Sequence, residues 1–111
     1  MSLSSSRRKK SNEASGYVGI LAADIHLPEN GSLKDKRQQL RSLKAALTRR
    51  LGASVAETGY HDLWQRSHLL ISISAGDVSE LERALDMAAR MIEERDLELA
   101  GAHREIVGIR D

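Results

Sequence analysis

Residues 17–52 read YVGILAADIHLPENGSLKDKRQQLRSLKAALTRRLG, and this stretch decides the fold. Its first part, residues 17–27, is rich in strand formers that alternate between two faces. One of these faces is aliphatic and carries Leu21, Ala23, Ile25 and Leu27. Pro28 closes the strand because proline cannot donate a ladder hydrogen bond. The pattern therefore predicts a strand with one buried face, followed by a turn.

A helix is predicted over residues 33–51. Ser32 is a good N-cap, Asp35 follows it as in a capping box, and Gly52 suits the position just after the helix. Leucines at helical spacing form an apolar stripe at Leu40, Leu43, Leu47 and Leu51. A basic stripe flanks them at steps of three, four and three residues, at Lys34, Arg37, Arg41 and Lys44. Like charges at such spacings repel one another, so the helix gains little from its own charges.

The rest of the chain adds three strands and one helix. Strands are predicted at residues 53–58, at 68–74 and within 97–109, and a second helix begins after Asp77. The order β-α-β-β-α-β is that of the ferredoxin-like α+β fold, with two helices on one face of a four-stranded antiparallel sheet. Residues 16–111 are predicted to form this single domain. Residues 1–15 are too poor in apolar side chains to pack, and we predict a disordered basic tail.

Charge is distributed unevenly along the chain. Residues 1–50 carry 11 of the 17 Lys and Arg but only 4 of the 16 Asp and Glu, a net charge of +7, whereas residues 51–111 carry −6. A positive field on one element attracts phosphates or acidic surfaces even when the net charge is near zero. There is no cysteine, so disulfides and thiolate chemistry are excluded. No secretory or membrane-spanning segment is evident, and we expect a cytoplasmic protein.

Several motifs together resemble the YlxP-like proteins, small bacterial proteins assigned to a domain of unknown function. The resemblance covers residues 17–107 and depends on four stretches: 26–28 (HLP), 32–37 (SLKDKR), 54–57 (SVAE) and 62–66 (DLWQR). It implies a ferredoxin-like fold in the bacterial cytoplasm. The genes of this family often lie beside one for a ribosome-maturation factor, which implies a link to ribosome biogenesis. The family supplies no activity, cofactor or catalytic residue.

The basic helix is the first candidate site. Lys34, Lys36, Arg37, Arg41 and Lys44 could contact a phosphate backbone, although Lys36 lies nearer the apolar stripe. The alternative is internal neutralisation by acidic residues of the second helix, namely Glu82, Asp86, Glu93 and Glu94.

Residues 61–66 are the second candidate. Trp64 could stack a base or anchor a partner, with Arg66 beside it. A lone tryptophan more commonly packs over a core edge, and we favour that interpretation. Arg66 could equally pair with a carboxylate such as Glu57.

The histidines and glycines give little support for catalysis. His26, His61, His68 and His103 lack the close spacing of metal ligands, and no phosphate-binding glycine motif is present, so we expect neither a metal nor a cofactor. A pair formed by Asp24 and His26 is more consistent with a surface contact than with acid–base chemistry.

We therefore predict a non-enzymatic cytoplasmic protein that binds rRNA or a ribosomal particle through its first helix. The alternative is a homo-oligomeric interaction module that pairs through the open sheet face or edge. With Ala22, Asp24, Ser72 and Ser74 on it, the open face is predicted to be too polar for an obvious dimer core.

Overall fold

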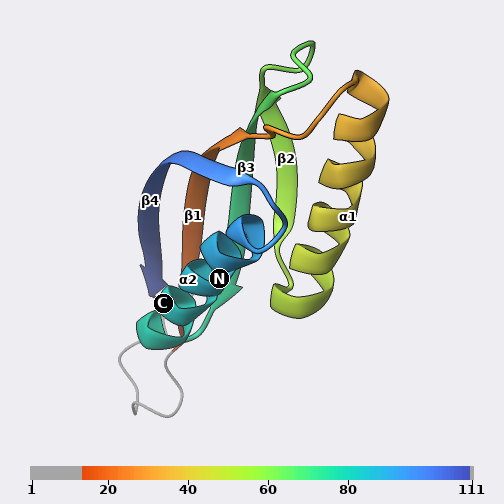
Figure 1. Cartoon of the computed structure of the whole chain (residues 1–111). Coiled ribbons are helices and arrows are strands. Elements are labelled where there is room, and N and C mark those ends of the chain that lie inside the picture. The colour runs from red at the N-terminus through yellow and green to blue at the C-terminus, as the bar shows by residue number, and fades with distance from the viewer. Residues whose placement is uncertain (1–13, 111) are drawn as a thin grey trace.

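The computed structural model of the protein describes residues 14–110. Its elements are β1 (Ser15–His26), α1 (Leu33–Leu51), β2 (Ser54–Gly59), β3 (Arg66–Ala75), α2 (Val78–Glu93) and β4 (Glu98–Arg110). The strands form one antiparallel sheet in the order β2-β3-β1-β4 (Figure 1). The predicted ferredoxin-like α+β fold is confirmed. Residues 1–13 of the predicted tail lie outside the described residues, and β1 begins at Ser15.

The first helix has the ends that its capping residues predict. The Ser32 hydroxyl oxygen accepts a hydrogen bond of 3.1 Å from the backbone N–H of Asp35. At the other end, Gly52 has a left-handed backbone with φ 64°, and its N–H donates to the Thr48 carbonyl at 2.9 Å. Glycine fits there because it has no Cβ to clash in that conformation.

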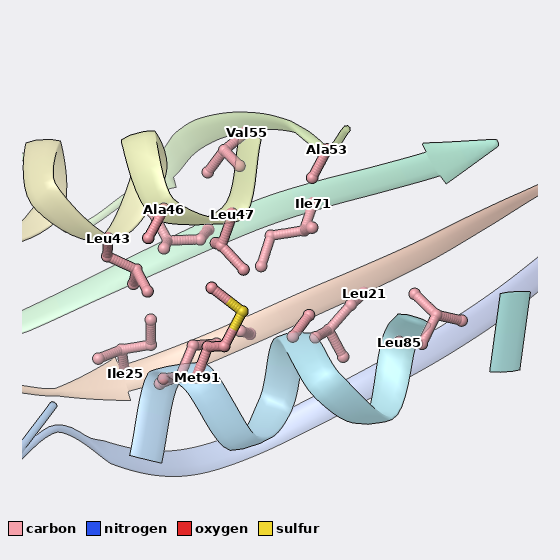
Figure 2. Packing of buried hydrophobic residues seen from close by; sticks show 14 of the residues in the cluster. Leu21, Ile25, Leu43, Ala46, Leu47, Ala53, Val55, Ile71, Leu85 and Met91 are labelled. Carbon is pink, nitrogen blue, oxygen red and sulfur yellow. The ribbon is translucent and has the colours of Figure 1, made fainter. Parts of the chain in front are cut away.

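The core lies between the sheet and the two helices, and it is aliphatic (Figure 2). The predicted inner face of β1 is confirmed, since Leu21, Ala23 and Ile25 are buried. Strand β1 also passes close to α2. A Cβ added at Gly19 would lie 2.9 Å from side-chain atoms of Leu81 and Leu85. No helix within residues 14–110 is long and apolar enough to cross a membrane.

The sheet has two distinct ends. At one end Ser15 of β1 pairs with Arg110 of β4, so the start of the first strand lies beside the end of the last strand. At the other end His26 pairs with Arg66 of β3, and the loops after β1 and β2 lie side by side. The backbone N–H of Leu27 donates to the Gln65 carbonyl at 2.9 Å and joins these two loops. Strands β3 and β4 extend one or two residues beyond the predicted ranges.

Candidate nucleic-acid interface

The exposed basic surface of α1 consists of four cations, all exposed: Lys34, Arg37, Arg41 and Lys44. At 3.6 residues per turn they fall within an arc of about 80° around the helix. This arc faces the β2 edge of the sheet. There Arg37, Arg41 and Lys44 border a groove that is also lined by Leu40 of α1, Val55 and Glu57 of β2, and Leu69 of β3.

The acidic residues of α2 do not neutralise this surface. Among the residues from 14 to 110, no carboxylate oxygen lies within 4.0 Å of a side-chain nitrogen of the four cations. Asp86 instead pairs with Arg104 of β4 at 2.9 Å. The reason is geometric. The side of α1 next to the end of α2 carries Gln39 and Ser42 and, in the last turns, Arg49 and Arg50, whereas Arg37, Arg41 and Lys44 lie on the side next to β2. The predicted alternative of internal neutralisation is therefore wrong for this part of the chain.

Lys36 does not belong to the exposed surface, and its predicted role as a phosphate contact is wrong. Its side chain is only 2% exposed. Its Nζ donates to the backbone carbonyls of Tyr60 and Leu63, each at 2.6 Å, and lies 2.9 Å from Glu57 Oε2. The Ser67 hydroxyl donates to the same carboxylate oxygen at 2.8 Å. Because Lys36 lies among the apolar positions of α1, it is directed into the protein and not toward solvent.

The loop between β2 and β3 presents three large apolar side chains to solvent. They are Tyr60, Leu63 and Trp64, which we call the hairpin tip. Trp64 is 47% exposed, so the interpretation that it packs over a core edge is wrong. The buried Asn30 side chain donates from its Nδ2 to the carbonyl of Trp64, which holds the tip against the β1–α1 loop.

Arg66 lies beside the hairpin tip but is paired with Asp24 and not with Glu57. Its Nη2 donates to both Asp24 carboxylate oxygens, at 3.1 and 2.9 Å. These hydrogen bonds raise the pKa of the Arg66 guanidinium above its usual value, so the group stays charged. The guanidinium carbon lies 4.2 Å from the centre of the Tyr60 ring, a cation–π contact. Arg66 therefore supports the tip, and its side chain remains 42% exposed.

The histidines take part in separate local contacts. His26 lies 3.1 Å from Glu98, and His103 lies 2.9 Å from Glu105. The Thr58 hydroxyl lies 2.8 Å from His68 Nδ1. Among residues 14–110, no three His, Asp or Glu side chains gather closely enough to hold a metal ion. Asp24 and His26 thus form two different pairs instead of one acid–base pair.

The open face of the sheet is more apolar than predicted. Leu70 of β3 and Val107 and Ile109 of β4 are exposed on it, next to partly buried Val18 and Ile20 of β1. The sequence pattern placed Ser72 and Ser74 on this face but left the limits of β4 vague, so the β4 contribution was missed.

Comparison with known proteins identifies related chains. A family described as "Protein of unknown function (DUF503)" matches residues 18–104. The uncharacterized protein YlxP of Bacillus subtilis (strain 168) is 26% identical over 76 residues, which is 68% of this chain and 83% of that protein.

Two solved structures are also similar. The de novo designed protein Foldit4 has a TM-score of 0.45 and 14% identity, and the match covers 86% of this chain and 96% of that one. SnoaB, a cofactor-independent oxygenase from Streptomyces nogalater, has a TM-score of 0.43 and 12% identity, with 83% and 90% covered.

Proposed function

The chain belongs to the DUF503 family, and we propose that it is a non-catalytic protein that binds structured RNA or a ribosomal particle through the exposed basic surface of α1. One observation carries this proposal. Four cations lie within one arc of a helix, and no carboxylate within residues 14–110 pairs with them. Cations held in this way are available to exchange counterions for the phosphates of a nucleic acid.

The length of the surface suits a polyanion. Lys34 and Lys44 are ten residues apart, so the cations extend about 15 Å along the helix axis. A single small anion would use only part of this length, whereas a phosphate backbone contacts cations at several successive positions. Because none of the acidic side chains of α2 pairs with these four cations, their field remains available to attract an anionic surface during approach.

A ribosomal partner is supported by the family resemblance. The YlxP-like pattern implies genes that often lie beside one for a ribosome-maturation factor. Structured RNA is also an abundant polyanion in the bacterial cytoplasm that the same resemblance implies. Together with the uncompensated cations, this favours RNA over an acidic protein.

Two matched variants test the proposal by co-sedimentation with ribosomal subunits. Arg37→Glu combined with Arg41→Glu reverses two charges on α1, and Arg83→Glu combined with Arg90→Glu reverses two exposed charges on α2. Both variants change the net charge by the same amount. We expect the α1 variant to lose binding and the α2 variant to retain it. An equal loss of binding in both variants would show that binding depends only on the net charge of the protein, and it would contradict a role for α1.

Salt dependence provides a second measure. If the four cations contact four phosphates, log affinity against log salt concentration should have a slope of roughly −3. Affinity should then fall about 50-fold between about 50 and 200 mM salt. A slope near zero would contradict phosphate contacts.

A homo-oligomeric module is the second candidate, supported by the exposed apolar side chains on the open sheet face. In this case Leu70 and Val107 of two copies would meet face to face. Light scattering of the wild type and of Val107→Asp tests the idea, with Ile106→Asp as the control. Ile106 directly precedes Val107 on β4 and lies on the opposite face of the sheet. A dimer that only Val107→Asp dissociates would support this candidate, and a monomeric wild type would reject it.

A further inference from the structure

The hairpin tip lies against the first turn of α1. Trp64 borders a shallow depression together with Gly31, Ser32, Leu33 and Asp62. Lys34, the first cation of the exposed basic surface, follows Leu33 directly. The indole ring therefore lies at the N-terminal end of that surface, and a nucleic-acid strand lying along α1 would pass it.

The indole is available to a ligand. Trp64 is 47% exposed. Arg66 makes its cation–π contact with the Tyr60 ring. Within the described part of the chain, no cation–π contact involves the Trp64 ring. Aromatic side chains exposed beside a basic surface are the usual stacking platforms for unpaired bases.

The backbone that carries Trp64 is fixed from inside the protein. The buried Lys36 ammonium binds the carbonyls of Tyr60 and Leu63, and the buried Asn30 amide binds the carbonyl of Trp64 itself. Lys36 also donates to the His61 carbonyl at 3.4 Å, so four of the five residues from 60 to 64 are held by side chains that are at most 4% exposed. A loop ordered before binding loses less conformational entropy when a ligand arrives.

The charge of the depression favours a base over a phosphate. The exposed carboxylate of Asp62 lines it and would repel a phosphate, but it can accept a hydrogen bond from the amino group of a base. We infer that Trp64 stacks one unpaired base of the RNA whose phosphates lie on α1, with Asp62 accepting a hydrogen bond from the amino edge of that base. This inference rests on the proposed function and assigns its preferred target, an RNA helix interrupted by an unpaired nucleotide.

The test uses the fluorescence of Trp64, which is the only tryptophan in the chain. The full-length protein is titrated with three synthetic RNA hairpins of one stem sequence: one with a single bulged cytidine, one with an abasic nucleotide at the bulge, and one fully paired. Stacking should quench the emission of Trp64 with the bulged cytidine only. Trp64→Ala should weaken binding of this hairpin roughly 5- to 150-fold and leave binding of the paired hairpin unchanged. Trp64→Phe, which keeps an aromatic face, should restore most of the affinity.

The outcomes separate this inference from the proposed function. Equal quenching by the bulged and abasic hairpins, or an equal loss of affinity for all three hairpins in Trp64→Ala, would overturn the stacking inference and leave binding by α1 intact. Failure of all three hairpins to bind, or binding that survives Arg37→Glu with Arg41→Glu, would overturn the proposed function. Quenching that depends on protein concentration without RNA would assign the tip to a contact between two copies and would also overturn stacking.

Discussion

Lys36 and Glu57 form a partly buried ion pair, with the ammonium nitrogen 2.9 Å from the carboxylate Oε2. The pair joins α1 to β2 and, through the carbonyls of Tyr60 and Leu63, to the loop that presents Trp64. It therefore connects the scaffold of the fold to the hairpin tip.

Replacing this lysine should destabilise the protein strongly. Lys36→Met keeps the length of the side chain but removes the ammonium group from Glu57 and from the three carbonyls that it binds, those of Tyr60, His61 and Leu63. Glu57 is one-quarter exposed, so we expect the free energy of unfolding to fall by about 2–4 kcal/mol, somewhat less than for a fully buried pair. Urea denaturation measures the change. Lys34→Met is the matched control on the same helix, and it should change stability by less than about 0.5 kcal/mol. Equal effects in the two variants would contradict the internal role of Lys36.

Removing a charge from the exposed basic surface should leave stability unchanged or improve it slightly. Arg41 has like charges three and four residues away and no carboxylate partner within residues 14–110, so Arg41→Gln relieves repulsion of roughly 0.2–0.5 kcal/mol. Arg104→Gln, which breaks the pair with Asp86, should instead lose up to about 1 kcal/mol. Urea denaturation of both variants measures these changes. A loss above about 1 kcal/mol in Arg41→Gln would reveal an internal partner and weaken the case for RNA.

Asn30 should control the order of the hairpin tip. Its Nδ2 donates to the carbonyls of Ser32 and Trp64, so Asn30→Ala removes two hydrogen bonds, and we expect a loss of about 1–3 kcal/mol. Amide hydrogen exchange should accelerate in residues 60–65 more than in α2. Asn30→Asp should be worse than Asn30→Ala, because it sets a carboxylate against two carbonyl acceptors. The opposite order of these variants would show that the amide does not hold the loop.

Gly19 should tolerate no side chain. A Cβ there would approach Leu81 and Leu85 to 2.9 Å, so Gly19→Ala overpacks the contact between β1 and α2, and we expect a loss of about 1–3 kcal/mol. Gly76 is the control, because a Cβ there has no atom within 4 Å and its φ is not positive. Gly76→Ala should leave the thermal midpoint unchanged or raise it slightly. Similar losses at the two positions would contradict the close approach of β1 to α2.

The elements with local signals could be predicted from sequence. The cap residues Ser32 and Gly52 and the leucine spacing between them specify α1 without reference to the rest of the chain, and its ends agree with the prediction. The alternation in residues 17–27 likewise gave the buried face of β1. Strand β4 was less certain, because Gly101 and Gly108 interrupt its pattern, and pairing with β1 supplies the order that local sequence does not.

The candidate site was only partly predictable, because its details depend on contacts between distant residues. Lys36 has the same charge as its neighbours, and only its position among the leucines of α1 indicated burial. Its acceptors, Glu57, Tyr60 and Leu63, come more than twenty residues later. Similarly, nothing local to Trp64 indicates that Asn30 holds its backbone while the ring stays exposed.

The pairing of Ser15 with Arg110 has a practical consequence for handling the molecule. Both strand ends lie some 40 Å along β1 from the loops after β1 and β2, given the rise of about 3.3 Å per residue in a strand. A dye, affinity handle or surface tether attached through either end is therefore held away from Trp64. Because these ends are adjacent, a short linker could also join them and new ends could be opened elsewhere, which would yield a circular permutant with the same sheet.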